Sequence, residues 1–207
     1  MTTEARHALL DDLEGLTNDQ WATVSLCRPW TVHQVLAHLV SPFERNLKLA
    51  ATTLAAERSI DGWFERLAVE MAERSSGPEL IGKLRAKASD RYFPSRLDAT
   101  SYNDVLVHAN DIRRVVGISR PEDPAKVVPA LDFVARHPMG RFSSPPSRRS
   151  GFGFEATDID WSTGDGALVS GTAINLLMGL TGRTHPTIEL SGAGADRFKA
   201  NLPNASE

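Results

Sequence analysis

The sequence predicts an α+β protein in which a helical bundle precedes a small unit of mixed helix and strand. Three observations support this prediction. Apolar residues recur at helical spacing through the first two thirds of the chain. A stretch rich in Gly, Pro and Ser follows, and strand-like alternation begins after it. We therefore expect a helical bundle over residues 1–140, a linker over 141–150 and a small α+β domain over 151–207.

The bundle is predicted from apolar stripes on successive segments. The first helix is expected over residues 3–16, with leucines along one face. The clearest start signal is Thr31 with Gln34 three residues later, a capping box in which each side chain binds a backbone N–H of the other residue. The apolar stripe that follows runs to residue 54, and Pro42 is expected to kink or end its helix. Further helices are expected over residues 61–74, 79–91, 100–116 and 124–137.

The last quarter of the chain has a different periodicity. Apolar residues alternate with other residues over 152–157, which is typical of a strand. The Gly-Asp-Gly sequence at 164–166 indicates a turn, and residues 171–180 return to a helical pattern. Residues 187–190 form a second candidate strand. These short elements predict the small α+β domain.

Composition and charge exclude several classes of function. The 207 residues carry a net charge of −3 and are 41% hydrophobic, as in ordinary globular proteins. A slightly acidic chain lacks the basic surface that binds nucleic acid, and no run of 18 apolar residues is present, so we expect neither a nucleic-acid nor a membrane partner. The single cysteine and the absence of a signal-peptide pattern lead us to expect a reduced, cytoplasmic protein.

A carboxylate and a histidine are four residues apart on the helix expected over 100–116. This spacing places Asp104 and His108 one above the other, where an oxygen and an imidazole nitrogen can bind one cation. Both positions fall at the edge of the apolar face of that helix. A surface pair without a metal has the same spacing and is the alternative interpretation.

Two further residues are candidates for chemistry. His38, on another long helix, is a possible third ligand, although helical phase puts it roughly 140° from the centre of the apolar stripe, which favours exposure to solvent. Cys27 lies before a helix N-terminus and is either a nucleophile or a small packed residue. Neither a Gly-x-Ser-x-Gly nor a Gly-x-Gly-x-x-Gly motif is present, so the sequence gives no support for a serine hydrolase or a nucleotide-binding protein.

Two blocks of the sequence resemble the mycothiol-dependent maleylpyruvate isomerase family, which belongs to the DinB-like four-helix metalloproteins. The first block covers residues 28–39, RPWTVHQVLAHL. The second covers residues 104–113, DVLVHANDIR, where the family usually has Glu-x-x-x-His-x-x-Asp-Ile-Arg. Towards the end of the chain, residues 160–162 and the sequence LTGR at 180–183 are similar to the small sterol-carrier-like C-terminal domain of the family. The resemblance therefore implies a DinB-like up-down bundle followed by that domain.

The resemblance also implies a site and an activity. It implies a divalent metal, usually zinc, held by His38, Asp104 and His108, and a substrate-binding role for Arg183. Aspartate replaces the usual glutamate at position 104, so the carboxylate arm is one methylene shorter. The expected cosubstrate is mycothiol, a low-molecular-weight thiol that a metal ionises near neutral pH. Its thiolate would attack a small electrophile, giving cis–trans isomerisation or S-transfer, and we expect a monomeric enzyme.

Two other functions agree with the same sequence. The chain is alternatively a non-catalytic module that binds a small or apolar ligand, with a degenerate metal site at Asp104. It is alternatively a structural or regulatory protein whose bundle surface binds a partner. Metal content separates the enzyme from the first of these alternatives.

Overall fold

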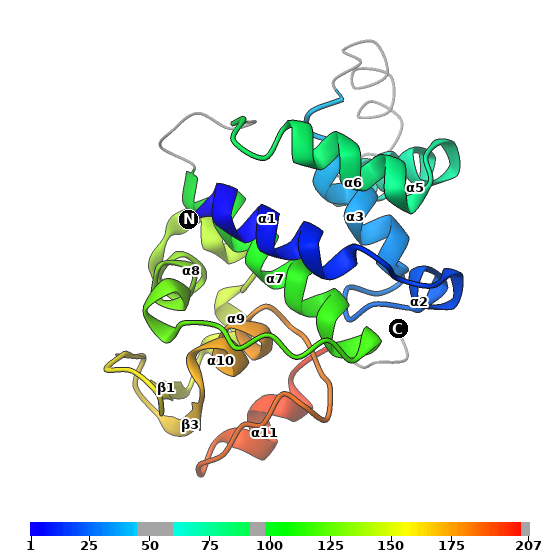
Figure 1. Cartoon of the computed structure of the whole chain (residues 1–207). Helices are drawn as coiled ribbons and strands as arrows, with labels where there is room; N and C mark the ends of the chain where they lie inside the picture. Colours follow the sequence, from blue (N-terminus) through cyan, green and yellow to red (C-terminus); the bar gives the residue numbers. More distant parts are fainter. Residues whose placement is uncertain (45–59, 92–97, 204–207) are drawn as a thin grey trace. The chain divides into compact units, whose positions relative to one another are not determined.

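A computed structural model of the chain contains two compact, mostly helical units, and the second holds a small sheet, so the predicted α+β class is confirmed (Figure 1). The structure describes residues 1–44, 60–91 and 98–203. The first unit comprises residues 1–95 and 111–118, and the second comprises 96–110 and 119–207. The domain boundary predicted at 141–150 stays a prediction.

The first unit is built from short helices around a leucine-rich core. Its elements are α1 (Thr2–Leu13), α2 (Asn18–Ala22), α3 (Val32–Val40), α5 (Ile60–Arg74), α6 (Gly77–Ala86) and the last turns of α7 (Asp98–Val116). Helix α3 packs against α5 and α6, and α1 packs against α6. Helix α3 ends at Val40, which confirms the stop expected near Pro42. The continuation of the apolar stripe beyond residue 44 lies outside the described residues.

Helix α2 was not expected from periodicity, yet its start has the same signal as α3. The side chain of Thr17 accepts a hydrogen bond from the backbone of Gln20, and the side chain of Gln20 accepts one from the backbone of Thr17. This capping box satisfies two backbone donors in a helix of only five residues. A five-residue helix is too short to show a 3.6-residue period, which is why the stripe analysis missed it.

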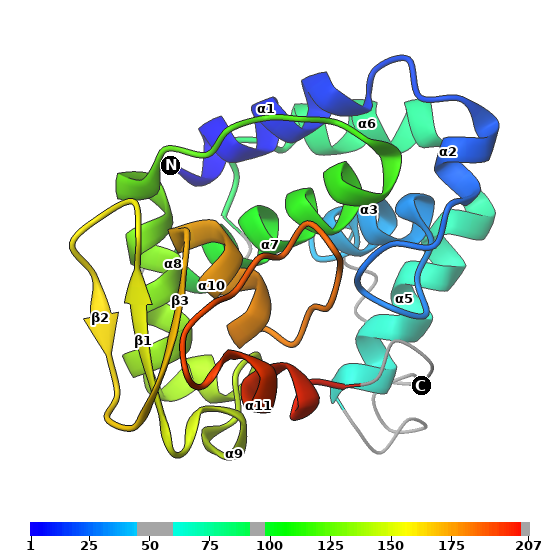
Figure 2. The ribbon, with the colours of Figure 1, turned by 90° about the horizontal axis from the view of Figure 1, so that it is seen from below.

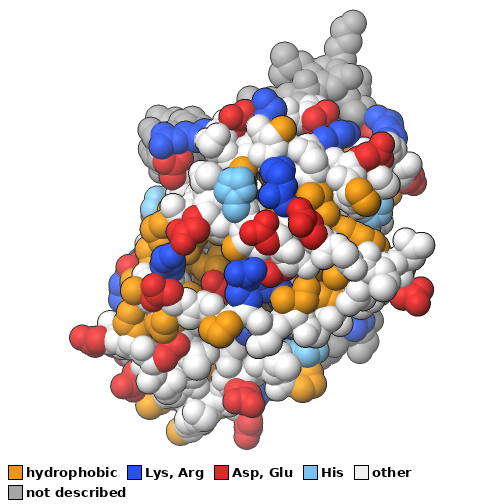
Figure 3. Space-filling view, in the orientation of Figure 1, with side chains coloured by type: hydrophobic (Ala, Val, Ile, Leu, Met, Phe, Trp, Pro, Cys, Tyr) orange, Lys and Arg blue, Asp and Glu red, His pale blue; other side chains and the backbone are white. Residues whose placement is uncertain are grey.

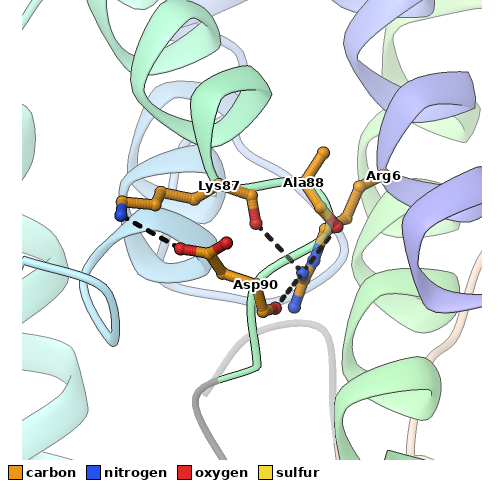
Figure 4. Close-up of polar contacts among 4 residues, drawn as sticks. All are labelled: Arg6, Lys87, Ala88 and Asp90. Atoms are coloured by element: carbon orange, nitrogen blue, oxygen red, sulfur yellow. Dashed lines mark hydrogen bonds and ion pairs between the residues drawn. The ribbon is translucent and has the colours of Figure 1, made fainter.

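A buried arginine joins α1 to the end of α6 (Figure 4). The side chain of Arg6 is 2% exposed, and its Nη1 donates to the carbonyl oxygens of Ala88 at 2.9 Å and Asp90 at 2.8 Å. A longer contact of 3.4 Å reaches the carbonyl oxygen of Lys87. These carbonyls follow the last turn of α6, where backbone oxygens lack helical partners and carry partial negative charge. The guanidinium therefore caps α6 from a neighbouring helix.

The second unit combines helices with a three-stranded sheet. Besides the first part of α7 it contains α8 (Pro124–Arg136), η2 (Pro138–Phe142), α9 (Pro146–Arg149), β1 (Phe152–Ala156), β2 (Ser162–Thr163), β3 (Ala167–Gly171), α10 (Ala173–Leu180) and α11 (Ala195–Ala200). The strand order is β2-β1-β3; β1 pairs antiparallel with β2 and parallel with β3, in the register Phe154 to Val169 (Figure 2). Helix α10 packs against α8, and Phe198 of α11 meets Phe154 edge to face at 5.1 Å.

The second unit differs from expectation in several elements. Residues 187–190, all described, form no strand, so that prediction is wrong. A turn at His185 takes its place: the backbone N–H of Thr187 donates to Nδ1 of His185, and that of Ile188 donates to its carbonyl oxygen at 2.9 Å. These local bonds occupy the donors that a strand ladder would use. Helix α9 lies inside the stretch predicted as a linker, and it begins with Pro146, a residue favoured in the first turn of a helix.

Candidate metal centre

Helix α7 carries the predicted carboxylate–histidine pair. Its apolar residues Tyr102, Val105 and Ile112 are buried, as the stripe analysis expects. His108 is also buried, at 7% exposure, whereas Asp104 is half-buried. The two side chains therefore lie at the edge of the packed face, one turn apart, where a bound ion would be shielded but accessible.

The distance between these two side chains fits a shared metal ion. Nε2 of His108 is 3.4 Å from Oδ1 of Asp104. A charge-assisted hydrogen bond between such groups is about 2.7–2.9 Å long. Two ligands on one tetrahedral zinc, at bond lengths near 2.0–2.1 Å, are separated by about 3.3 Å, the edge of the tetrahedron. The observed separation is longer than such a hydrogen bond and is compatible with two ligand atoms on one cation.

His38 belongs to the first unit, where two aromatic rings hold its imidazole. Its ring centroid is 4.8 Å from that of Trp30 and 5.6 Å from that of Phe64. Helix α3 starts at the predicted Thr31–Gln34 capping box, which fixes its first turn. The ring packing fixes the imidazole plane, as a metal ligand requires.

The expectation that His38 faces solvent needs correction, because the residue is half-buried. Six of the nine residues of α3 are buried, since α5 and α6 pack against different sides of it. A helix covered on more than one side has no single polar face, so the phase of its apolar stripe does not predict which side chains reach solvent. Sequence reasoning did not single out Phe64 as a residue near the site. Its ring also contacts that of the neighbouring residue Trp63.

Arg183 follows α10 in the second unit, at a tight turn. Gly182 adopts φ +89°, and the backbone N–H of Arg183 bonds to the carbonyl oxygen of Met178, which ends the helix in the usual left-handed manner. Nη1 of Arg183 donates to the carbonyl oxygen of Thr181 at 2.7 Å. Burial, together with the positive charge of Arg183, lowers the pKa of Arg148. The positive charges of the two guanidinium groups therefore oppose each other.

Arg148 was missed in the sequence because it lies in the stretch interpreted as a linker. Its Nη1 donates to the carbonyl oxygens of Ser143 and Leu180, each at 2.9 Å.

Cys27, the candidate nucleophile, is half-buried in the first unit, and its backbone N–H donates to Oγ of Ser25 at 3.1 Å.

The sequence analysis expects neither a nucleic-acid nor a membrane partner, and two features of the structure bear on these expectations. Acidic and basic side chains are interspersed over the face drawn in Figure 3, as on a solvated surface. Among the helices that the structure describes, none has the length and hydropathy to span a bilayer.

Comparison with known proteins gives a family match for the N-terminal part of the chain. Residues 2–93 match a family model described as the mycothiol maleylpyruvate isomerase N-terminal domain. The matched stretch covers the first sequence block and agrees with the helical first unit, as expected for a DinB-like domain. Neither a curated protein nor a solved structure matches the chain.

Proposed function

We propose that the chain is a metal-dependent enzyme that uses mycothiol, because residues 2–93 match the family model of the mycothiol maleylpyruvate isomerase N-terminal domain. It acts on a small electrophile, either by thiol-assisted cis–trans isomerisation or by S-transfer. The observation that supports this proposal best is the 3.4 Å separation of the Asp104 and His108 ligand atoms. The monomeric state and cytoplasmic location stay predictions.

His38, Asp104 and His108 are the proposed ligands of a divalent ion, with zinc the best fit to two imidazoles and one carboxylate. When bound, such an ion stabilises the thiolate of a coordinated thiol near neutral pH. Two neutral histidines and one carboxylate balance only part of a +2 charge, so the ligand set favours an anion at an open position. Trp30 and Phe64 pack on the imidazole of His38 and keep it oriented.

The chemistry that follows conserves atoms and charge. The thiol loses its proton to solvent, and its sulfur forms a bond to the electron-poor carbon of the substrate. For an activated double bond, the carbanion is delocalised into a neighbouring carbonyl, rotation follows, and expulsion of the thiolate regenerates the double bond. For a substrate with a leaving group, the leaving group departs with the electron pair and the thioether is the product. Arg183 is proposed to bind a substrate carboxylate through its planar fork.

The metal content of purified protein and its variants tests this proposal. We expect about one zinc per chain in the native protein, as for a single three-ligand site, and its loss in His38→Ala, Asp104→Ala and His108→Ala. His7→Ala removes an exposed histidine of the first unit and is the matched control, which should keep the metal. Plasma mass spectrometry gives the stoichiometry.

A second measurement follows the thiol rather than turnover. The ultraviolet absorbance of thiolate, recorded across a pH titration with mycothiol or N-acetylcysteine, should show the thiol pKa falling well below its free value of about 8.5 only with metal-loaded native protein or His7→Ala. A folded native protein that takes up no zinc would overturn the proposal and favour the non-catalytic binding module.

A charge-neutral substrate tests the role of Arg183. Arg183→Ala is expected to raise KM for a carboxylate electrophile by about tenfold to hundredfold, because a charge-assisted bidentate pair is lost. The methyl ester of the same electrophile should be turned over equally well by both proteins. Arg183→Lys keeps the charge without the fork and should fall between them. An equal effect on acid and ester would assign Arg183 a structural role instead.

A further inference from the structure

The segment from the end of α8 to β1 has a charge opposite to that of the rest of the chain. Residues 133–154 contain four arginines and no lysine, aspartate or glutamate, so the segment carries +4. The other residues hold 19 Lys and Arg against 26 Asp and Glu, a charge of −7. Helices η2 and α9 lie within this segment, between α8 and β1 in the chain (Figure 2). Such a local reversal of charge indicates a surface for an anionic partner.

Three of the four arginines keep an uncompensated charge. Arg136 is balanced by Asp132 on α8, with which it forms an ion pair. Within residues 1–44, 60–91 and 98–203, which the structure describes, no ion pair involves Arg141, Arg148 or Arg149. Backbone carbonyl oxygens accept hydrogen bonds from two of these three, but a neutral acceptor does not cancel a positive charge. The segment therefore presents three cations to its surroundings.

The hydrogen bonds place these cations around η2. Nη1 of Arg148 donates to the carbonyl oxygen of Ser143, the residue that follows η2, at 2.9 Å. Nη1 of Arg149 donates to the carbonyl oxygen of Ala135, in the last turn of α8 shortly before η2. Arg141 belongs to η2 itself and is exposed. The three guanidinium groups therefore surround one turn of the chain.

Two apolar side chains project from the same turn. Phe142 is 69% exposed and Met139 is 41% exposed. They are three residues apart in a 3₁₀ helix, whose period of three residues places both on one side. The guanidinium of Arg141 lies 5.4 Å from the centroid of the Phe142 ring. The turn therefore combines a protruding apolar tip with positive charge around it.

Close packing against α8 holds the turn in this shape. Gly140 is buried, and a Cβ at this position would collide with the carbonyl oxygen of Phe133. The backbone N–H of Met139 donates to Nδ1 of His137 at 3.1 Å, which caps the start of η2. A turn ordered in this way before binding loses little conformational entropy when it binds.

We propose that η2 and the three arginines around it bind the surface of an anionic lipid bilayer. Phe142 and Met139 would enter the boundary between headgroups and acyl chains, and the guanidinium groups would bind lipid phosphates. The expectation of no membrane partner rests on the lack of an apolar run long enough to span a bilayer, which surface binding does not require. The proposal goes beyond the enzyme reaction and requires neither a metal nor a thiol.

The shape of this surface favours a lipid over a protein partner. A specific protein interface buries about 800 Å² on each partner, far more than the two apolar side chains of one turn provide. A fluid bilayer, by contrast, accepts a protruding side chain without a preformed groove. An acidic protein segment is therefore the alternative that the experiment has to separate from a lipid surface.

Co-sedimentation of the full chain with lipid vesicles tests the proposal. Vesicles of phosphatidylglycerol and phosphatidylcholine in equal amounts should bind the protein roughly a hundredfold more tightly than phosphatidylcholine alone, since each of three cations contributes about fivefold at an anionic surface. Raising the salt from about 0.1 M to about 0.5 M should weaken this binding. Neither metal nor mycothiol is added, so failure of the proposed enzyme reaction does not affect the result.

Two variants with matched controls identify the surface. Arg141→Gln should weaken binding to the anionic vesicles about fivefold, whereas Arg74→Gln, which removes an exposed arginine of the first unit that pairs with Glu70, should bind like the native protein. Phe142→Ser should weaken binding about tenfold or more, whereas Val24→Ser, at an exposed valine of the first unit, should not. All four side chains are exposed, so the variants should stay folded.

Equal binding of neutral and anionic vesicles would overturn the proposal, as would native affinity in both Arg141→Gln and Phe142→Ser. Retention on immobilised polyglutamate that depends on Arg141, without binding to either vesicle, would also overturn it and assign η2 to an acidic protein segment.

Discussion

Asp12→Ala is expected to lower the free energy of unfolding by about 3–5 kcal/mol, because it removes the carboxylate that pairs with a buried arginine. Nε of Arg113, on the last turns of α7, lies 2.7 Å from Oδ2 of Asp12 on α1. The two side chains are only 4% and 7% exposed, so water cannot replace the lost carboxylate. Urea denaturation followed by circular dichroism measures the effect.

The adjacent residue provides a matched control on the same helix. Asp11 pairs with Arg85 at 3.5 Å, but its side chain is 59% exposed, so Asp11→Ala should cost less than about 1 kcal/mol. The double variant Asp12→Leu with Arg113→Met should be more stable than Asp12→Ala, since it removes both buried charges together. Equal losses in Asp11→Ala and Asp12→Ala would show that the ion pair contributes no more than a surface charge.

The elements that sequence predicted well are those with a local signal. The Thr31–Gln34 capping box starts α3 where expected, because both partners lie within one helical turn. The four-residue spacing of Asp104 and His108 likewise determines their separation, since both belong to one regular helix.

The features that sequence missed depend on tertiary packing. The half-buried state of His38 results from neighbours on more than one side of α3, which no single stripe encodes. Residues 187–190 have strand composition, but the turn at His185 uses the backbone N–H groups of Thr187 and Ile188. Helix α11 was not expected either, because its six residues are too few to show a helical period.

Asp104→Asn is expected to weaken zinc binding by roughly two to three orders of magnitude if the proposed ligand set is right. A four-ligand structural zinc site contributes about 10–16 kcal/mol, or about 3 kcal/mol per ligand, and each 1.4 kcal/mol is tenfold in affinity. The amide keeps the shape of the carboxylate but removes the negative charge that balances the ion. Competition with a chromophoric zinc chelator measures the affinity.

Asp104→Glu keeps the negative charge at position 104 and changes only the length of the side chain. Glutamate has the longer side chain that is usual at this position in the family that the second sequence block resembles. Asp104 is half-buried on α7, so the extra methylene can be accommodated at the edge of the packed face. If the carboxylate binds zinc directly, Asp104→Glu should hold zinc at least as tightly as the native protein, while Asp104→Asn fails. If Asp104 instead only orients His108 through its 3.4 Å contact, the asparagine variant should lose no more than about tenfold to hundredfold, the range for an outer ligand partner. The ratio of the two variants' affinities therefore distinguishes a metal ligand from a residue that positions one.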